Sequence, residues 1–309
     1  MSKIKVGIIF GGESFEHQVS KMTARSIIEH IDRALFDVSE IYIDPNGKFD
    51  DDLLNDIDVA FLAVHGPNCE DGKLQQFLEN RRIKYTGSGI EASKINMSKS
   101  LMHNTFKKAG LPVVKYRAFN KNEFDIIADK AINDFKFPIF IKPDNAGSSV
   151  GISKIDNMEE LEPAIKEAFK RDNRIVVEQG IENPREIEIG VLGNNDLIIS
   201  EPGEVLSKGQ FYSYENKYLN PFETTTKVID LHPEQVKVLK QVAVSAYTST
   251  HCRGYARVDF LMDKNNKIFI SEINTLPGFT SISMFPKLME TVNITYKDLI
   301  TKIIYLSLE

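Results

Sequence analysis

The chain has 309 residues, 42% of them hydrophobic and 27% charged, with a formal net charge of −6. A chain of this length usually folds as two or three domains with a substantial core. The negative charge disfavours a nucleic-acid or anionic-membrane partner, and no apolar run approaches the roughly 20 residues of a membrane helix.

The first part of the chain alternates short apolar runs with helical stretches. Residues 5–10 form an apolar run that stops at Gly11-Gly12 and indicates a buried parallel strand. Residues 38–43 and 58–64 are two further strand candidates. A helix is expected to begin near Ser14, because serine is a favourable N-cap residue. This alternation predicts a doubly wound α/β domain with a parallel sheet.

The rest of the chain mixes strands and helices. Gly110 and Pro112 end a predicted helix that begins at residue 98, and Pro233 opens another helix over residues 231–250. Further strands are expected at residues 138–142, 150–155, 175–178 and 186–192. Residues 204–227 are polar and rich in tyrosine, and we expect a long loop there, which is usually functional or disordered.

The two cysteines, Cys69 and Cys252, lie too far apart in the sequence to indicate a disulfide framework. We expect both to be buried free thiols in a reducing compartment. The N-terminus opens with charged residues before an apolar run, unlike a secretory signal. The protein is therefore expected to be cytoplasmic, with no membrane partner.

Residues 255–274 predict a β-hairpin whose turn is residues 263–266. We take Met262 and Lys267 as its closing pair, which puts Arg257 opposite Glu272. Side chains alternate between the two faces of a strand, so one face gathers Arg257, Asp259, Glu272 and Asn274. The other face, expected to contact the core, carries Ala256, Val258, Phe260, Phe269 and Ile273.

The polar face of this hairpin suits a metal and a phosphate. Carboxylate and amide oxygens are ligands for Mg²⁺, which also takes oxygens from substrate phosphates. Arg257 could stabilise a transferring phosphoryl group. The alternative is a solvated face with cross-strand ion pairs. The turn at residues 274–281 favours the metal site, because its Gly, Pro and hydroxyl residues can present backbone N–H groups to an anion.

Residues 142–151, Lys-Pro-Asp-Asn-Ala-Gly-Ser-Ser-Val-Gly, form a glycine-containing loop between two strands. The loop is neither a Walker A motif nor a dinucleotide fingerprint, because no helix opens with Gly-Lys-Ser/Thr. Such a loop can fold over a triphosphate as a flap, with Lys142 reaching the phosphates. An ordinary hairpin turn is the alternative.

The order and spacing of these motifs resemble the D-alanine–D-alanine ligases of the ATP-grasp superfamily. The matching segments are residues 11–20, 65–72, 142–151, 201–204, 211–218 and 257–283. The resemblance implies an N-terminal α/β domain over residues 1–94, followed by a two-part ATP-grasp fold over residues 95–180 and 181–309. ATP would be clamped between the sheets of the last two parts.

The resemblance also implies a reaction that supplies peptidoglycan precursors. The carboxylate of one D-alanine is activated by ATP as an acylphosphate. The amine of a second D-alanine then attacks, which gives the dipeptide, ADP and phosphate. The family further implies a homodimer formed through the N-terminal domain.

Substrate-binding roles follow from the same resemblance. Glu16 would hold the ammonium of the first D-alanine and form a closing triad with Ser148 and Tyr218. His65 would orient the first substrate, and Ser283 would bind the carboxylate of the second. The alternatives are favourable placement of a carboxylate near a helix N-terminus for Glu16 and a structural role for His65.

The nucleotide and metal roles are implied in the same way. Residues 178–181 would frame the adenine, and Glu186 would bind the ribose. Two Mg²⁺ ions, or Mn²⁺, would be held by Asp259, Glu272 and Asn274. Arg257 and the backbone of Gly278 would stabilise the tetrahedral intermediate. The full set expected to contact ATP is Lys99, Lys142, Ser149, Glu178, Ile181, Glu186 and Lys217.

The chain departs from the family pattern at three positions. Cys69 stands where glycine is common, Ser98 where the family commonly has the aspartate of Met-Asp-Lys, and Ala146 where an acidic residue is frequent. None of these replaces a metal ligand or a triad member, so we expect changes in loop packing or nucleotide affinity. Tyr218 matches the dipeptide-forming enzymes and favours D-alanine as acceptor. The alternatives are a related ligase with another acceptor, such as D-lactate or D-serine, and an inactive nucleotide-binding paralogue.

Overall fold

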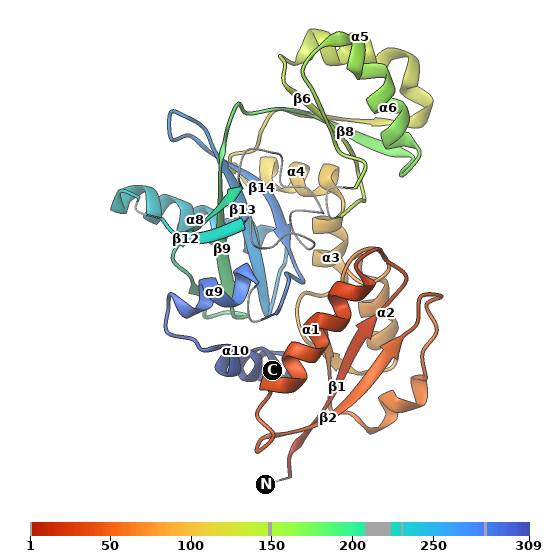
Figure 1. The fold of residues 1–309 in the computed structure, drawn as a ribbon, viewed down its shortest axis with the longest axis vertical. Coiled ribbons are helices and arrows are strands. Elements are labelled where there is room, and N and C mark those ends of the chain that lie inside the picture. Colours follow the sequence, from red (N-terminus) through yellow and green to blue (C-terminus); the bar gives the residue numbers. More distant parts are fainter. Residues whose placement is uncertain (1, 148–149, 208–223, 230, 281–282) are drawn as a thin grey trace.

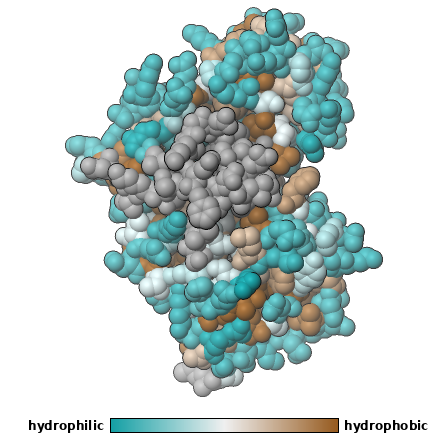
Figure 2. All heavy atoms as spheres, in the orientation of Figure 1, coloured by the Kyte–Doolittle hydropathy of each residue, from teal (hydrophilic) through white to brown (hydrophobic). Residues whose placement is uncertain are grey.

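The structure is a computed structural model, and it describes residues 2–147, 150–207, 224–229, 231–280 and 283–309. Within these residues, three sheets follow one another along the long axis of the molecule (Figure 1). Hydrophilic side chains dominate the upper and lower ends of the face drawn in Figure 2. No helix in the described ranges is long and apolar enough to cross a bilayer.

The first sheet is parallel, with the strand order β2-β1-β3-β4. Its strands are β1 (Ile4–Gly11), β2 (Phe36–Ile43), β3 (Val59–Leu62) and β4 (Lys84–Tyr85), and its connections include α1 (His17–His30), η1 (Asp51–Asp56) and α2 (Lys73–Asn80). The predicted parallel sheet with alternating helices is confirmed. Helix α1 begins three residues later than expected, and Glu16 occupies its N-cap position.

The last helix, α10 (Tyr296–Leu308), packs against this first sheet rather than standing apart from it. Its buried side chains, Leu299, Ile300, Ile303 and Ile304, belong to the same hydrophobic core as β1 and β3. The Tyr296 hydroxyl donates to the carbonyl of Phe279 at 2.6 Å. The two ends of the described chain therefore share one core, which Figure 1 shows beside α1.

Helices α3 (Ile90–Met97) and α4 (Lys99–Lys108) lead to a small antiparallel sheet with the order β5-β8-β6-β7. Its strands are β5 (Tyr116–Asn120), β6 (Ile139–Pro143), β7 (Ser153–Ile155) and β8 (Arg174–Gln179). Its core includes side chains of α5 (Phe124–Asp134) and α6 (Leu161–Phe169), and η2 (Lys121–Glu123) and η3 (Met158–Glu160) lead into these helices. The strand expected at residues 150–155 is thus reduced to its last three residues.

The largest sheet is antiparallel and runs β12-β11-β9-β13-β14, with β10 paired to β9. Its strands are β9 (Arg185–Leu192), β10 (Ile198–Ile199), β11 (Gly203–Ser207), β12 (Thr224–Val228), β13 (Tyr255–Met262) and β14 (Ile268–Asn274). Helix α8 (Pro233–Ser249) supplies buried side chains to its core, and α9 (Met284–Glu290) contacts β9. This sheet forms the middle of the molecule in Figure 1.

The prediction of a long loop over residues 204–227 is wrong at both ends of that range. Residues 203–207 and 224–228 pair with each other as β11 and β12. The second of these segments is a run of three threonines, Lys and Val, and β-branched residues fit a pleated surface well. The segment between these strands, residues 208–223, lies outside the described residues.

The predicted register of the β13–β14 hairpin is also wrong. Met262 pairs with Ile268 instead of Lys267, because the turn closes through a hydrogen bond from the Asp263 N–H to the Lys267 carbonyl at 3.0 Å. A β-bulge then shifts the pairing, so that Asp259 lies opposite Glu272. Arg257 consequently faces Asn274 and not Glu272.

The bulge explains why the polar face was predicted correctly and why only Phe269 of the predicted core face is wrong, since Ala256, Val258, Phe260 and Ile273 are all buried. Ser271 is the extra residue of β14, and a bulge reverses which side chains point to each face. On the turn side of the bulge, Ile270 is fully buried and Phe269 is only partly buried. Beyond the bulge, Glu272 and Asn274 return to the face that carries Asp259.

Helix α10 should be as important for the first sheet as that sheet's own helices. Truncating Ile303, which is 0% exposed, to alanine is expected to lower the free energy of unfolding by about 2–5 kcal/mol. Lys302→Ala, at the exposed neighbouring position, is the control and should change it by less than about 0.5 kcal/mol. Urea unfolding followed by circular dichroism measures both, and equal midpoints for the two variants would contradict the packing.

Candidate active site

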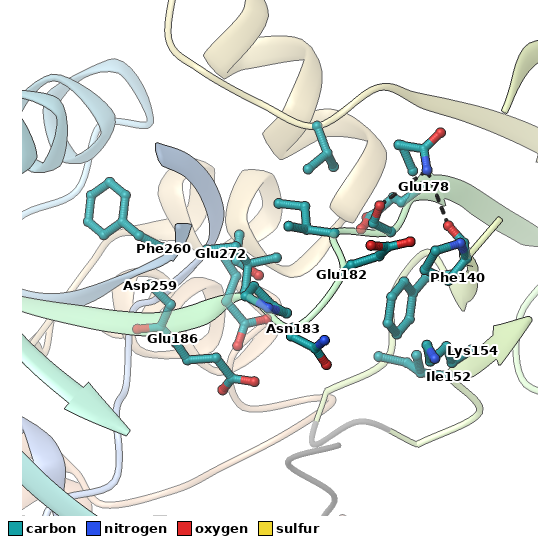
Figure 3. Close-up of a pocket in the computed structure, with 18 of the residues that line it drawn as sticks. Phe140, Ile152, Lys154, Glu178, Glu182, Asn183, Glu186, Asp259, Phe260 and Glu272 are labelled. Carbon is teal, nitrogen blue, oxygen red and sulfur yellow. Dashed lines mark hydrogen bonds between the residues drawn. The ribbon is translucent and has the colours of Figure 1, made fainter. Parts of the chain in front are cut away.

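A cavity of about 700 Å³ lies between the small sheet and the middle sheet, which is within the range of roughly 300–1,000 Å³ typical of small-molecule sites. One wall consists of residues from the small sheet, and the segment 180–184 connects it to the opposite wall. Figure 3 shows Asp259, Glu272 and Glu186 on one side and Phe140 and Glu178 on the other. The predicted residues that line this cavity are Lys142, Glu178, Ile181, Glu186, Asp259 and Glu272.

The Lys142 ammonium on β6 is paired with the Glu178 carboxylate on β8 at 2.6 Å. His103 Nε2 lies 2.9 Å from the other oxygen of Glu178. Burial raises the pKa of Glu178, but Lys142 and His103 outweigh this effect and hold the pKa well below its ordinary value. Glu178 is therefore an anion that fixes the position of the Lys142 side chain.

The sequence analysis did not single out His103. It lies on α4, buried to 1% exposure, with its ring stacked on Tyr116 at a centroid distance of 4.7 Å. Its position four residues after Lys99 puts both side chains on one face of the helix. This spacing is the signal that could have revealed it.

Lys99 stands at the first position of α4 and is partly buried. Its Nζ atom donates to the carbonyl of Ala146 at 2.5 Å, at the start of the glycine loop. Burial lowers the pKa of Lys99, while the nearby carboxylates of Glu272 and Glu178 act in the opposite direction. Lys99 therefore lies within electrostatic range of both walls of the cavity.

The opposite wall carries a buried network around Arg257. Its Nε and Nη2 atoms bind the two oxygens of Asp259 at 2.7 and 2.6 Å, and Nε lies 3.1 Å from Glu188. Burial lowers the pKa of Arg257, but Asp259 and Glu188 outweigh it, so the pKa is raised well above its ordinary value. Glu188 was not predicted, although it follows Glu186 at the two-residue spacing of one strand face.

The residues expected to hold a metal fit Mg²⁺ by the chemistry of their donors. Asp259 and Glu272 are cross-strand neighbours, and the Asn274 side-chain amide donates to Asp259 at 2.9 Å. Within the described ranges, no three His, Cys, Asp or Glu side chains come together in a way that could hold a metal. Two carboxylates and an amide would thus need phosphate oxygens to complete the coordination, as Mg²⁺ commonly does.

Glu16 and His65 lie together at the edge of the first sheet, both buried. His65 Nε2 is 3.1 Å from the Thr23 hydroxyl, and Nδ1 is 3.6 Å from Glu70. Burial lowers the pKa of His65, but Glu70 and Glu16 outweigh it and raise the pKa above its ordinary value. A Cβ atom on Gly147 would lie 4.0 Å from the Glu16 carboxylate, so the glycine loop reaches Glu16 at the edge of the first sheet.

The turn after β14 carries the last predicted residues. The Ser283 hydroxyl accepts a hydrogen bond from the Thr280 N–H at 3.0 Å, and a Cβ atom on Gly278 would lie 3.2 Å from it. Gly278 and Ser283 are therefore neighbours, as expected. Four predicted residues lie outside the described part of the chain: Ser148, Ser149, Lys217 and Tyr218.

The cysteines are free and buried, as predicted. Burial raises the pKa of the Cys69 thiol to about 12, with the surrounding carboxylates acting in the same direction. The thiol therefore stays protonated at neutral pH, and protonated thiols are poor nucleophiles. Cys69 therefore acts as a small buried side chain in the loop between β3 and α2.

Two sheets that face each other across a cavity, with a lysine–glutamate pair on one wall and a group of acidic side chains around an arginine on the other, define this chain as an ATP-grasp enzyme. Its sequence matches two family models. One is described as D-ala D-ala ligase C-terminus, over residues 105–305, and the other as D-ala D-ala ligase N-terminus, over residues 5–54 and 49–88. The chain belongs to the D-alanine–D-alanine ligase family, and the resemblance seen in its motifs is confirmed.

Individual relatives agree with this assignment. A D-alanine–D-alanine ligase of Caldicellulosiruptor bescii is 39% identical, with 100% of this chain and 96% of the relative covered. The D-alanine–D-alanine ligase of Bacillus anthracis, solved in complex with ATP, is 29% identical with a TM-score of 0.84, covering 99% of this chain and 97% of that one. The VanG D-Ala:D-Ser ligase of Enterococcus faecalis is 29% identical with a TM-score of 0.88, covering 99% and 100%.

The Lys142–Glu178 pair gives a prediction for stability against pH. Glu178→Gln should lower the free energy of unfolding at neutral pH by about 3–5 kcal/mol, because it leaves a buried cation without its partner. Since the pKa of Glu178 is lowered from 4.5 by folding, its stabilisation is complete above that value and is lost as the pH falls further. Urea unfolding of wild type and variant from about pH 8 to pH 3 measures the difference between their free energies of unfolding. This difference should stay constant near neutral pH and become smaller only in acid.

The exposed Glu182, which also lines the cavity, supplies the matched control. Glu182→Gln should match wild type throughout the series. A gap between wild type and Glu178→Gln that disappears already at pH 6 would show that the Glu178 pKa is not lowered.

Proposed function

We propose that this chain joins two D-alanine molecules into D-alanyl-D-alanine and converts ATP to ADP and phosphate. The observation that carries the proposal is the cavity between the two ATP-grasp sheets. Its lysine wall can bind phosphates, and its acidic wall can bind the cations that accompany them. The solved relative from Bacillus anthracis has ATP bound within the same overall fold.

In this proposal the nucleotide occupies the cavity. The backbone and side chains of residues 178–181 frame the base, and Glu186 accepts hydrogen bonds from the ribose. Lys99 and Lys142 bind phosphate oxygens, and Glu178 keeps Lys142 in place for this task. Ser149 and Lys217 are assigned to the same nucleotide by the family resemblance.

Mg²⁺, when bound by Asp259, Glu272 and Asn274, neutralises charge on the phosphates and on the transferring group. The chain's own contribution to this step is Arg257, whose guanidinium is held by two carboxylates. A fixed cation close to developing negative charge stabilises the transition state without reorganising solvent. A divalent cation at Asp259 would compete with Arg257, which would leave the guanidinium available to the reacting groups.

The amino-acid substrates lie at the other end of the site in this proposal. The Glu16 carboxylate binds the ammonium of the first D-alanine, and His65 helps to shape that pocket. Ser283 binds the carboxylate of the second, beside the Gly278 backbone. The glycine loop reaches Glu16 through Gly147 and would exclude water, which would otherwise hydrolyse the acylphosphate.

D-alanine is the acceptor we propose, because the curated relative at 39% identity is a D-alanine–D-alanine ligase. A ligase that uses D-serine has an equally similar fold, so the fold does not discriminate between acceptors. Assembly as a homodimer and a cytoplasmic location stay predictions.

The proposed reaction is tested by incubating the purified protein with ATP, Mg²⁺ and D-alanine as the sole amino acid. We expect D-alanyl-D-alanine and phosphate in equal amounts, measured by chromatography and a phosphate assay. Parallel reactions with D-serine or D-lactate added should give mainly D-alanyl-D-alanine. Absence of the dipeptide would refute the proposal. If the product with D-serine or D-lactate greatly exceeded D-alanyl-D-alanine, that compound would be the acceptor instead.

Glu272→Gln tests the acidic wall. The substitution removes one charge from the proposed metal site while keeping the shape of the side chain. We expect kcat to fall by about a hundredfold or more and the Mg²⁺ concentration needed for half-maximal activity to rise. Glu290→Gln, at an exposed position on α9, is the control. Near-normal turnover of the Glu272 variant at low Mg²⁺ would refute the metal role.

A further inference from the structure

Asp144 joins the end of β6 to the beginning of α4. Its side chain is 3% exposed. Oδ1 accepts a hydrogen bond from the Ser100 N–H at 2.7 Å, and Oδ2 accepts from the hydroxyls of Ser98 at 2.7 Å and Ser100 at 3.1 Å. Its backbone carbonyl accepts from the Lys99 N–H at 3.0 Å. One residue thus makes four hydrogen bonds to three consecutive residues of another element.

These contacts fix the first turn of α4. Ser98 is the N-cap of the helix, and its hydroxyl accepts from the Leu101 N–H at 3.3 Å. The Asp144 carboxylate adds a negative charge at the helix N-terminus, where it is favoured by the helix dipole. The backbone N–H of Asp144 in turn donates to the Arg174 carbonyl on β8 at 3.0 Å. The first turn of α4 is therefore anchored to the small sheet through Asp144.

Lys99 occupies the centre of this arrangement. Its backbone is held by the Asp144 carbonyl, and its ammonium reaches the Ala146 carbonyl two residues further along the loop. Two effects lower the pKa of Lys99: its burial and the positive charge of Lys142. The carboxylates of Glu272, Glu178 and Asp144 act in the opposite direction. Asp144 thus acts on Lys99 both by geometry and by charge.

We propose that Asp144 is a positioning residue for Lys99 and that it performs this role as one half of a carboxylate–hydroxyl pair with Ser98. This inference rests on the proposed contact of Lys99 with nucleotide phosphates. The pair also accounts for serine at position 98, where the family commonly has aspartate. In this chain Asp144, after β6, supplies the carboxylate of the hydrogen bond, and Ser98, at the start of the helix, supplies the hydroxyl. A carboxylate at both positions would place two negative charges at hydrogen-bond distance, which is strongly unfavourable.

The first test is Asp144→Asn, which keeps the size of the side chain and removes its charge. We expect the KM for ATP and the Kd of a non-hydrolysable ATP analogue to rise by roughly tenfold, because charge-assisted hydrogen bonds are lost. The KM for D-alanine should stay within about twofold of wild type, since the amino-acid end is not touched. Calorimetric titration and steady-state kinetics supply the values, and thermal unfolding confirms that each variant is folded at the assay temperature.

Asp172→Asn is the matched control. Asp172 also accepts hydrogen bonds from the loop, from the backbone and side chain of Asn145 at 2.8 and 2.9 Å. Its side chain accepts these hydrogen bonds and one from the Arg174 N–H at 3.2 Å, and neither Asn145 nor Arg174 lies on α4. Its nucleotide affinity should equal that of wild type. If Asp144→Asn also left nucleotide affinity unchanged, the positioning role would be refuted.

The second test exchanges the two partners. Ser98→Asp alone should weaken nucleotide binding, because it faces Asp144 with a like charge. Combining Ser98→Asp with Asp144→Ser restores one carboxylate and one hydroxyl, and aspartate is also a good N-cap residue. We expect the nucleotide affinity of the double variant to return to within about threefold of wild type. If the two substitutions acted independently, their losses of affinity would add up instead. The proposal would be overturned if the double variant bound nucleotide no more tightly than the single variant with the lower affinity.

Lys99→Met separates this inference from the proposed function. If Lys99→Met weakens nucleotide binding and Asp144→Asn does not, only the role of Asp144 fails. If Lys99→Met leaves nucleotide binding unchanged, the proposed contact of Lys99 with phosphates fails, and the inference fails with it.

Discussion

The site is organised by the need to neutralise buried charges before any substrate arrives. Lys142 and Glu178 form a 2.6 Å pair on one wall of the cavity, and Arg257 binds Asp259 with two hydrogen bonds on the other. A buried charge without a partner is costly, so each wall is already paired within itself. In the proposed function, a nucleotide and its metal ions would exchange partners with these groups. That exchange would couple substrate binding to the release of Arg257.

The sequence predicted the strands and helices well where local pattern decides them, and poorly where packing does. The apolar run at residues 5–10 lies within β1, and the helix predicted from residue 98 is α4, which begins at Lys99. The bulge at Ser271 was not predictable, because the choice between Phe269 and Ile270 for the core depends on the neighbouring strand and helix. The prediction missed a shift of one residue at the turn and a second shift of one residue at the bulge. Because each shift reverses the faces of the strand, the two together left the polar side chains on the predicted face. The acidic group at Asp259 and Glu272 was therefore identified through an incorrect register.

The remaining site residues show the same division. Motif residues such as Lys142 and Glu16 were recognised because their order in the chain resembles a known family. His103, Glu188 and Asp144 act through contacts between distant segments, and Asp144 contacts Ser98 across 46 residues of sequence. No periodicity in one element reports which residue of another element will face it. Spacing within one element could have pointed to His103 and Glu188, but the partners of all three residues become visible only in the structure.

Helix α10 has a consequence for how the protein is made. Its 13 residues complete the core of a sheet that is built from the first quarter of the chain. Domains usually fold in order as they emerge during synthesis. Here the first sheet would leave the ribosome with one apolar face uncovered and could close it only after residues 296–308 had been translated. Contacts over such long sequence separations slow folding, so the part of the apolar face that α10 covers stays exposed to solvent until these residues have been synthesised.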